Sequence, residues 1–71
     1  METHSIDIVV NGAPQQLSPG ASVIDLISRR GLDPHRVAIE INRELVRRSS
    51  FDVHRIEPGD RVEIVEFVGG G

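Results

Sequence analysis

The chain has 71 residues and a formal net charge of −3, with 38% hydrophobic, 27% charged and 3% aromatic residues. A chain of this length buries only about 60% of the surface that its unfolded form exposes, so we expect one small domain without a large internal active site. The negative charge and the scarcity of aromatic side chains argue against nucleic-acid binding.

An antiparallel hairpin is expected at the beginning of the chain. Residues 5–10 alternate between apolar and polar side chains, and the apolar face carries Ile6, Ile8 and Val10. The following Asn11-Gly12 pair favours a two-residue type I′ turn, because both central residues of that turn need a positive φ. Residues 13–17 should return as the second strand. Pro14 lacks a backbone N–H and therefore indicates either an edge position or the start of a strand.

A short helix should follow the hairpin. Ser22 and Asp25 have the spacing of a capping box, with aspartate in place of the usual glutamate. Three apolar residues then fall on one helical face: Val23, Leu26 and Ile27. Gly31 suits the position after the helix end, and Pro34 prevents the helix from continuing. So short a helix is stable only when a sheet covers its apolar face.

Two strands joined by a turn are expected after the helix. Residues 37–41 alternate, with Ala38 and Glu40 opposite the apolar face. Residues 42–44 are predicted to form a turn, and residues 45–46 a short strand.

A loop should link this hairpin to the last strand. Phe51 is expected to anchor the loop to the core, and Val53 and Ile56 to belong to a helical turn. Residues 57–60, Glu-Pro-Gly-Asp, give a strong turn signal. The final strand is predicted over residues 62–68.

The resulting order, β-β-α-β-β-β, favours an α+β fold of the ubiquitin-like β-grasp type. In that arrangement a mixed sheet packs on one main helix, and the first and last strands are central neighbours that run parallel. The order of elements comes from the sequence, whereas the strand pairing is taken by analogy with that fold. We expect the β-grasp domain to span residues 1–68 and residues 69–71 to form a flexible tail.

The tail consists of Gly69, Gly70 and Gly71 and follows the last strand directly. Because glycine has no Cβ, such a tail can lie extended in a channel too narrow for side chains. We expect Gly71 to be the terminal residue and its α-carboxylate, anionic at neutral pH, to be the reactive group. A frayed terminus and a linker stay open as alternatives.

Other kinds of site receive little support from the sequence. Without cysteine, disulfides, thiolate metal sites and cysteine nucleophiles are excluded. The three histidines show no metal-ligand spacing, so no metal site is expected. No apolar run is long enough for a signal peptide or a membrane span, so we expect a cytoplasmic protein that binds no membrane.

Four segments, in order along nearly the whole chain, carry a family resemblance: residues 10–12, 22–27, 37–42 and 58–71. On these segments the chain resembles the bacterial sulfur carrier protein of thiamine biosynthesis (ThiS), a β-grasp protein that ends in Gly-Gly. Two positions depart from the family pattern. Arg43 stands where the family usually has glycine, and Gly69 is an additional glycine before the matching pair.

The resemblance implies a carrier with no catalytic residues and no bound cofactor. An adenylating (E1-like) partner enzyme would use ATP to activate the carboxylate of Gly71, with Gly70 and Gly69 recognised in the tail. Sulfur from a cysteine persulfide would then produce a thiocarboxylate, which would donate its sulfur to thiazole synthase.

An exposed apolar set beside the tail would suit partner docking, and it comprises Val65, Phe67 and Val68. Ordinary core packing of the last strand is the alternative. Likewise, Arg43, Arg47 and Arg48 could steer an acidic partner or simply be solvated surface.

Three rival functions stay open. The small subunit of molybdopterin synthase uses a similar fold and tail, although it typically has prolines before its glycines. A ubiquitin-like modifier is a second rival, and the absence of lysine argues only against lysine-linked polymers. An inert interaction module is the third.

Overall fold

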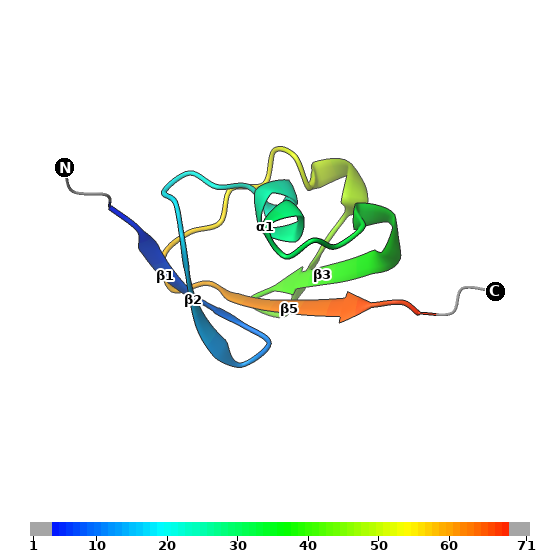
Figure 1. The fold of residues 1–71 in the computed structure, drawn as a ribbon, viewed down its shortest axis with the longest axis horizontal. Helices are drawn as coiled ribbons and strands as arrows, with labels where there is room; N and C mark the ends of the chain where they lie inside the picture. The colour runs from blue at the N-terminus through cyan, green and yellow to red at the C-terminus, as the bar shows by residue number, and fades with distance from the viewer. Residues whose placement is uncertain (1–3, 69–71) are drawn as a thin grey trace.

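Among residues 4–68, five strands form one mixed sheet that packs on a single α-helix (Figure 1). The structure is a computed structural model that describes residues 4–68. The strands are β1 (Ile6–Val10), β2 (Ala13–Leu17), β3 (Val37–Ile41), β4 (Glu44–Val46) and β5 (Arg61–Glu66). Their order across the sheet is β2-β1-β5-β3-β4. The predicted α+β fold and the predicted order of elements are confirmed.

The central strand of the sheet is β5, which pairs with β1 on one side and β3 on the other. It runs parallel to β1, with Val10 opposite Val62, and antiparallel to β3, with Ile39 opposite Ile64. The first and last strands are therefore parallel central neighbours, as predicted. Pro14 lies in the edge strand β2, where a missing N–H costs no ladder hydrogen bond.

Both hairpins turn through two residues with positive φ. In the first hairpin these are Asn11 (φ 51°) and Gly12 (φ 83°), as the sequence predicts. In the second they are Asn42 (φ 53°) and Arg43 (φ 71°). Arg43 thus adopts a left-handed conformation that a side chain disfavours, so the turn keeps its type without the glycine.

The helix α1 (Val23–Arg29) begins in a complete capping box. The Ser22 hydroxyl accepts from the Asp25 N–H at 3.3 Å, and the Asp25 carboxylate accepts from the Ser22 N–H at 2.9 Å. Beyond the helix end, Gly31 has a φ of 70°, as a left-handed residue in that position requires. The start, the apolar face and the end of this helix are all as predicted.

Two short 3₁₀ helices lie elsewhere, η1 (Pro34–Arg36) and η2 (Arg48–Ser50). The helical turn predicted for Val53 and Ile56 is confirmed at Val53, where the Val53 and His54 N–H groups donate to the Ser50 carbonyl at 3.1 and 2.8 Å, and is wrong at Ile56. The Ile56 N–H donates to the Ala21 carbonyl at 2.9 Å, which holds this segment extended beside the start of α1. The Ile56 side chain is buried in the core, whereas the Val53 side chain is exposed.

The last strand is shorter than predicted, because its partner β3 ends the pairing. Val37, the first residue of β3, lies opposite Glu66. One further backbone hydrogen bond joins the Phe67 N–H to the Arg36 carbonyl at 2.7 Å. Phe67 and Val68 therefore lie beyond the strand. The tail predicted over residues 69–71 falls outside the described residues.

The core fills the space between α1 and the facing side of the sheet. Its buried side chains are Ile8, Val10, Leu17, Val23, Leu26, Ile27, Val37, Ile39, Ile41, Val46, Phe51, Ile56 and Val62. Phe51 anchors the loop after β4, as predicted. In the part of the chain that the structure describes, no helix has the length and apolar character needed to cross a membrane.

Candidate functional site

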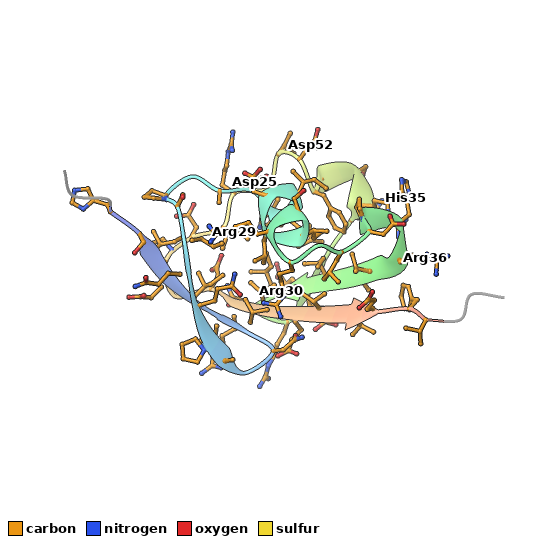
Figure 2. All side chains as sticks on the ribbon, in the orientation of Figure 1. Asp25, Arg29, Arg30, His35, Arg36 and Asp52 are labelled. Atoms are coloured by element: carbon orange, nitrogen blue, oxygen red, sulfur yellow. The ribbon has the colours of Figure 1, made fainter. Side chains whose placement is uncertain are left out.

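The central strand β5 carries the chain to one end of the sheet, where Phe67 and Val68 follow it (Figure 1). Residues of β3 and η1 meet β5 at the same end, since Val37 lies opposite Glu66. Figure 2 shows His35 and Arg36 beside this end of the molecule. We call this region the tail base and define it by Arg36, Val37, Glu66 and Phe67.

Two hairpin asparagines fix β5 from both sides. The Asn11 side chain bonds to the backbone of Ile64, with its Oδ1 accepting the Ile64 N–H at 2.7 Å. On the other side, the Asn42 Oδ1 accepts the Arg61 N–H at 3.0 Å. Both bonds join turn residues to the central strand, so they set the position at which β5 reaches the tail base.

Exposed apolar side chains surround the tail base. Val65 is 56% exposed, Phe67 52% and Val68 83%. Val65 lies on the sheet face opposite α1, directly across from Ala38. These are the three residues that the sequence singled out for docking, and each of them presents its side chain to solvent.

The structure adds two residues that sequence reasoning missed, Ala38 and Leu45. Leu45 is 69% exposed on β4 and, like Ala38, alternates away from the buried residues of its strand. The alternation of residues 37–41 already placed Ala38 opposite the apolar face, whereas the two apolar residues predicted for the next strand, Leu45 and Val46, gave no indication of which one faces outward. The sequence also lacked the register between β3 and β5, which brings Ala38 and Leu45 toward Phe67.

A small hollow of about 150 Å³ joins these residues at the end of the sheet. We call it the tail-base hollow. It is lined by Val37, Ala38, Leu45, Val46, Arg47, Arg48, Phe51 and Phe67. Buried side chains form part of its lining, and exposed ones surround them.

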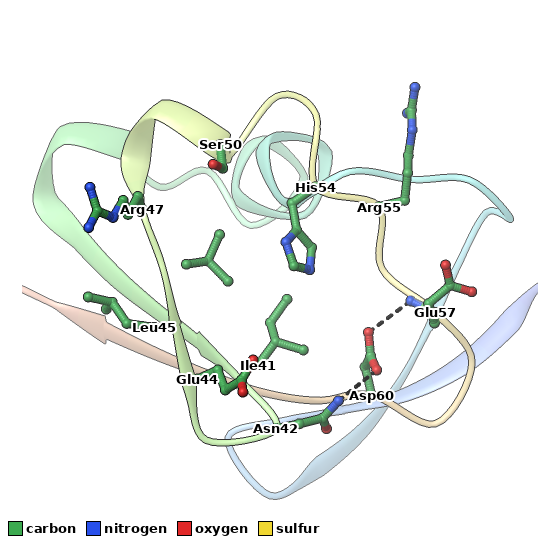
Figure 3. A pocket seen from close by; sticks show the side chains of 11 residues that line it. Ile41, Asn42, Glu44, Leu45, Arg47, Ser50, His54, Arg55, Glu57 and Asp60 are labelled. Atoms are coloured by element: carbon green, nitrogen blue, oxygen red, sulfur yellow. Dashed lines mark hydrogen bonds between the residues drawn. The ribbon is translucent and has the colours of Figure 1, made fainter.

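A larger hollow of about 450 Å³ lies between β4 and the loop before β5 (Figure 3). Three of the residues that line it hold the turn that precedes β5. The Asp60 carboxylate accepts from the Asn42 side-chain amide at 3.0 Å and from the Glu57 N–H at 2.9 Å. These groups therefore serve the structure of the turn.

One carboxyl group in the described chain has a clearly shifted pKa. Hydrogen bonds from the Ser22 backbone N–H and hydroxyl hold the pKa of Asp25 below its ordinary value, and the charge of Arg55 adds to the effect. This group caps α1 and lies away from the tail base (Figure 2). Among residues 4–68, no three side chains of His, Asp or Glu gather as metal ligands would.

The arrangement of strands around one helix defines a protein class, the ubiquitin-like β-grasp domains. The backbone is similar to a designed protein based on human erythrocytic ubiquitin, with a TM-score of 0.51 at 16% identity. At that identity, the likeness concerns the fold alone.

Within this class, the chain belongs to the ThiS family, whose model matches residues 8–71. The crystal structure of a thiamine biosynthesis protein (ThiS) from Geobacter metallireducens is similar, with a TM-score of 0.79 and 32% identity. That match covers 93% of this chain and 100% of the other.

Two similar proteins differ in how much of their own length this chain matches. A thiazole synthase of Paramagnetospirillum magneticum is 39% identical over 64 residues, which are 90% of this chain but only 20% of that protein. This chain thus spans about a fifth of the length of that relative. The uncharacterised protein ycf40 of Porphyra purpurea is 37% identical over the full length of both chains.

Proposed function

We propose that the protein is a sulfur carrier of thiamine biosynthesis and that the Gly71 carboxylate is its reactive group. An E1-like enzyme would adenylate this carboxylate, and the terminal sulfur of a cysteine persulfide would displace AMP to form an acyl disulfide. A thiol, such as free cysteine, would then reduce that disulfide, which releases the thiocarboxylate and leaves a disulfide on the donor. Thiazole synthase would then receive the sulfur. Membership of the ThiS family and the likeness to a thiamine biosynthesis protein support this assignment.

The chemistry explains why a carrier of this kind needs an activating enzyme. A carboxylate is a poor electrophile, because oxide is a poor leaving group. When a carboxylate oxygen attacks the α-phosphorus of ATP, pyrophosphate leaves and an acyl adenylate forms. A sulfur nucleophile can then displace AMP. The partner enzyme holds ATP and its metal, so the carrier contributes the acyl group and a recognisable surface.

The observation that carries the proposal is the exit of the chain from the central strand. The strand β5 is paired on both sides, and Asn11 and Asn42 bond to its backbone. The position at which the following residues leave the sheet is therefore fixed. Three residues span at most about 10 Å, so an enzyme that reaches Gly71 through residues 69–71 must approach the tail base closely.

We assign the docking surface to the apolar side chains around the tail base. Val65, Phe67 and Val68 are at least half exposed, and Leu45 and Ala38 extend the set across the outer face. Ordering glycine residues costs on the order of 1–2 kcal/mol each. Contacts to this surface would offset that cost when the tail enters a partner.

Thiazole synthase is the proposed acceptor of the sulfur. Two proteins with that name, from Paramagnetospirillum magneticum and Magnetococcus marinus, contain a stretch 39% and 33% identical to this chain. Because these thiazole synthases contain a segment similar to this chain, we expect a separate carrier and a separate thiazole synthase to act on one another.

Intact-protein mass spectrometry tests the proposal. The protein is incubated with the adenylating enzyme, ATP, a cysteine desulfurase and cysteine. One terminal oxygen should be replaced by sulfur, and the same spectrum shows whether Gly71 ends the mature chain. A variant lacking Gly71 should fold and remain unmodified. An unchanged mass of the intact protein, with an enzyme that is active on another carrier, would refute the assignment.

A further inference from the structure

The size of the tail-base hollow indicates what it can hold. Pockets for small molecules usually measure about 300–1,000 Å³, whereas this hollow measures about 150 Å³. It is therefore suited to a single side chain of another protein. Its lining is mostly apolar, with Phe51 and Val46 buried and Leu45 and Phe67 exposed.

Two arginines, Arg47 and Arg48, complete the lining. The Arg48 Nε donates to the Pro34 carbonyl at 2.9 Å, so this guanidinium is tied to η1. The ion pair found within residues 4–68 joins Arg36 and Asp33 at 3.9 Å. In that part of the chain, neither Arg47 nor Arg48 has a carboxylate within ion-pair distance.

Arg43 does not belong to this group, although the sequence placed it with the other two. It lies in the turn before β4, whereas Arg47 follows the end of β4. Arg43 lines a different hollow, with Asn42, Arg61 and Glu63. A protein with a net charge of −3 thus presents two arginines in its tail-base hollow.

We propose that the tail-base hollow receives one apolar side chain of the adenylating enzyme, and that a carboxylate beside that side chain pairs with Arg47. This inference rests on the proposed function and adds the chemistry of the partner surface. A buried apolar anchor next to a hydrogen-bonded charge pair is the kind of contact that dominates protein interfaces. Arginine also suits such a pair, because its planar guanidinium binds a carboxylate through two hydrogen bonds.

The position of the arginines favours the adenylating enzyme as the occupant. That enzyme must bring an anionic tail next to an anionic nucleotide. Positive charge on the carrier beside the tail offsets part of this repulsion, because a cation attracts both anions. It also steers the encounter with an acidic surface of the enzyme.

The apolar part of the inference is tested with two matched variants, Leu45→Ser and Val53→Ser. Both side chains are exposed, at 69% and 66%, but only Leu45 lines the hollow. Affinity for the purified adenylating enzyme is measured by calorimetry with the full-length carrier. Leu45→Ser should weaken binding about tenfold, and Val53→Ser should change it less than about twofold. Equal effects of the two variants would overturn the inference.

The charged part is tested with Arg47→Glu and Arg43→Glu, which change the net charge equally. At low salt Arg47→Glu should weaken binding about tenfold more than Arg43→Glu does, and the difference should shrink at high salt. Equal losses for the two variants would mean that only net charge matters, and would overturn the assigned pair. Circular dichroism checks that each variant folds.

Thiocarboxylate formation and binding, measured together, separate a failure of this inference from a failure of the proposed function. If wild type acquires the thiocarboxylate while all four variants bind as wild type does, the tail-base hollow is not the contact and the sulfur carrier assignment stands. If wild type neither binds nor is modified, both assignments fall.

Discussion

The side chain of Asn11 bonds to both backbone groups of Ile64, 53 positions further along the chain. Its Oδ1 accepts the Ile64 N–H at 2.7 Å, and its Nδ2 donates to the Ile64 carbonyl at 3.2 Å. The amide group therefore acts as one more residue of β1 and continues the parallel pairing with β5. Asn11 has a φ of 51° in the hairpin turn, so one residue shapes the first hairpin and holds the strand that leads to the tail.

Replacing Asn11 by glycine should separate these two roles. Glycine accepts the positive φ but loses both bonds to Ile64, so the free energy of unfolding should fall by about 1–2 kcal/mol. Asn11→Asp is the matched control, because its carboxylate can still accept the Ile64 N–H but cannot donate to the carbonyl. Urea denaturation measures all three proteins. A glycine variant as stable as wild type would show that the two bonds contribute nothing.

Arg43 offers the opposite change, a stabilising substitution. Its φ of 71° is unfavourable for a side chain, so Arg43→Gly should raise the free energy of unfolding by about 0.5–1 kcal/mol. Gly12→Ala is the control with the reverse sign. Gly12 has a φ of 83° and open space where an added Cβ would lie, so any loss in that variant reflects backbone conformation alone. Thermal unfolding of both variants checks the prediction. A destabilised Arg43→Gly would show that the arginine side chain has a structural role.

The capping box predicts a particular dependence of stability on pH. Because the pKa of Asp25 is lowered in the folded protein, its carboxylate contributes stability above its unfolded pKa of about 3.9. That contribution is lost as the pH falls through the folded pKa. The difference in unfolding free energy between wild type and Asp25→Asn should thus be constant above about pH 5 and shrink below about pH 4. Denaturation curves at several pH values measure it, and a constant difference down to about pH 2 would contradict the assignment.

The local elements that the sequence predicted correctly are fixed by neighbouring residues, whereas the parallel pairing of β1 with β5 was predicted by analogy. The capping box of Ser22 and Asp25 and the Asn11-Gly12 turn depend on contacts within a few positions. The helical turn expected to include Val53 and Ile56 ends before Ile56, because a hydrogen bond to the distant Ala21 carbonyl decides the conformation of Ile56. Local spacing carries no information about such a partner.

Contacts between distant residues also decide which side chains meet at the candidate site. The sequence identified Val65, Phe67 and Val68, since they follow one another at the end of the last strand. The tail-base hollow also needs Ala38 and Leu45, which reach Phe67 only through the pairing of β4 with β3 and of β3 with β5. A single sequence shows the faces of an alternating strand but not the register that joins it to its neighbours.

The proposed docking surface leads to a kinetic prediction for Val65→Ser and Phe67→Ser. Both side chains are more than half exposed, so neither change should disturb the core. The Phe67 backbone bond to Arg36 also remains. If these side chains contact the adenylating enzyme, the KM for the carrier should rise about tenfold while kcat stays close to the wild-type value. The reason is that the acyl chemistry at Gly71 is separated from the docking surface by the tail.

Steady-state pyrophosphate release at varied carrier concentration separates the two kinetic constants for these variants. Val53→Ser serves as the control, because it removes a comparably exposed side chain outside the tail base. A lowered kcat with an unchanged KM would contradict a docking role, since it would place Val65 or Phe67 in the chemical step. Kinetics identical to wild type for both variants would remove this surface from recognition and leave the tail alone to determine affinity.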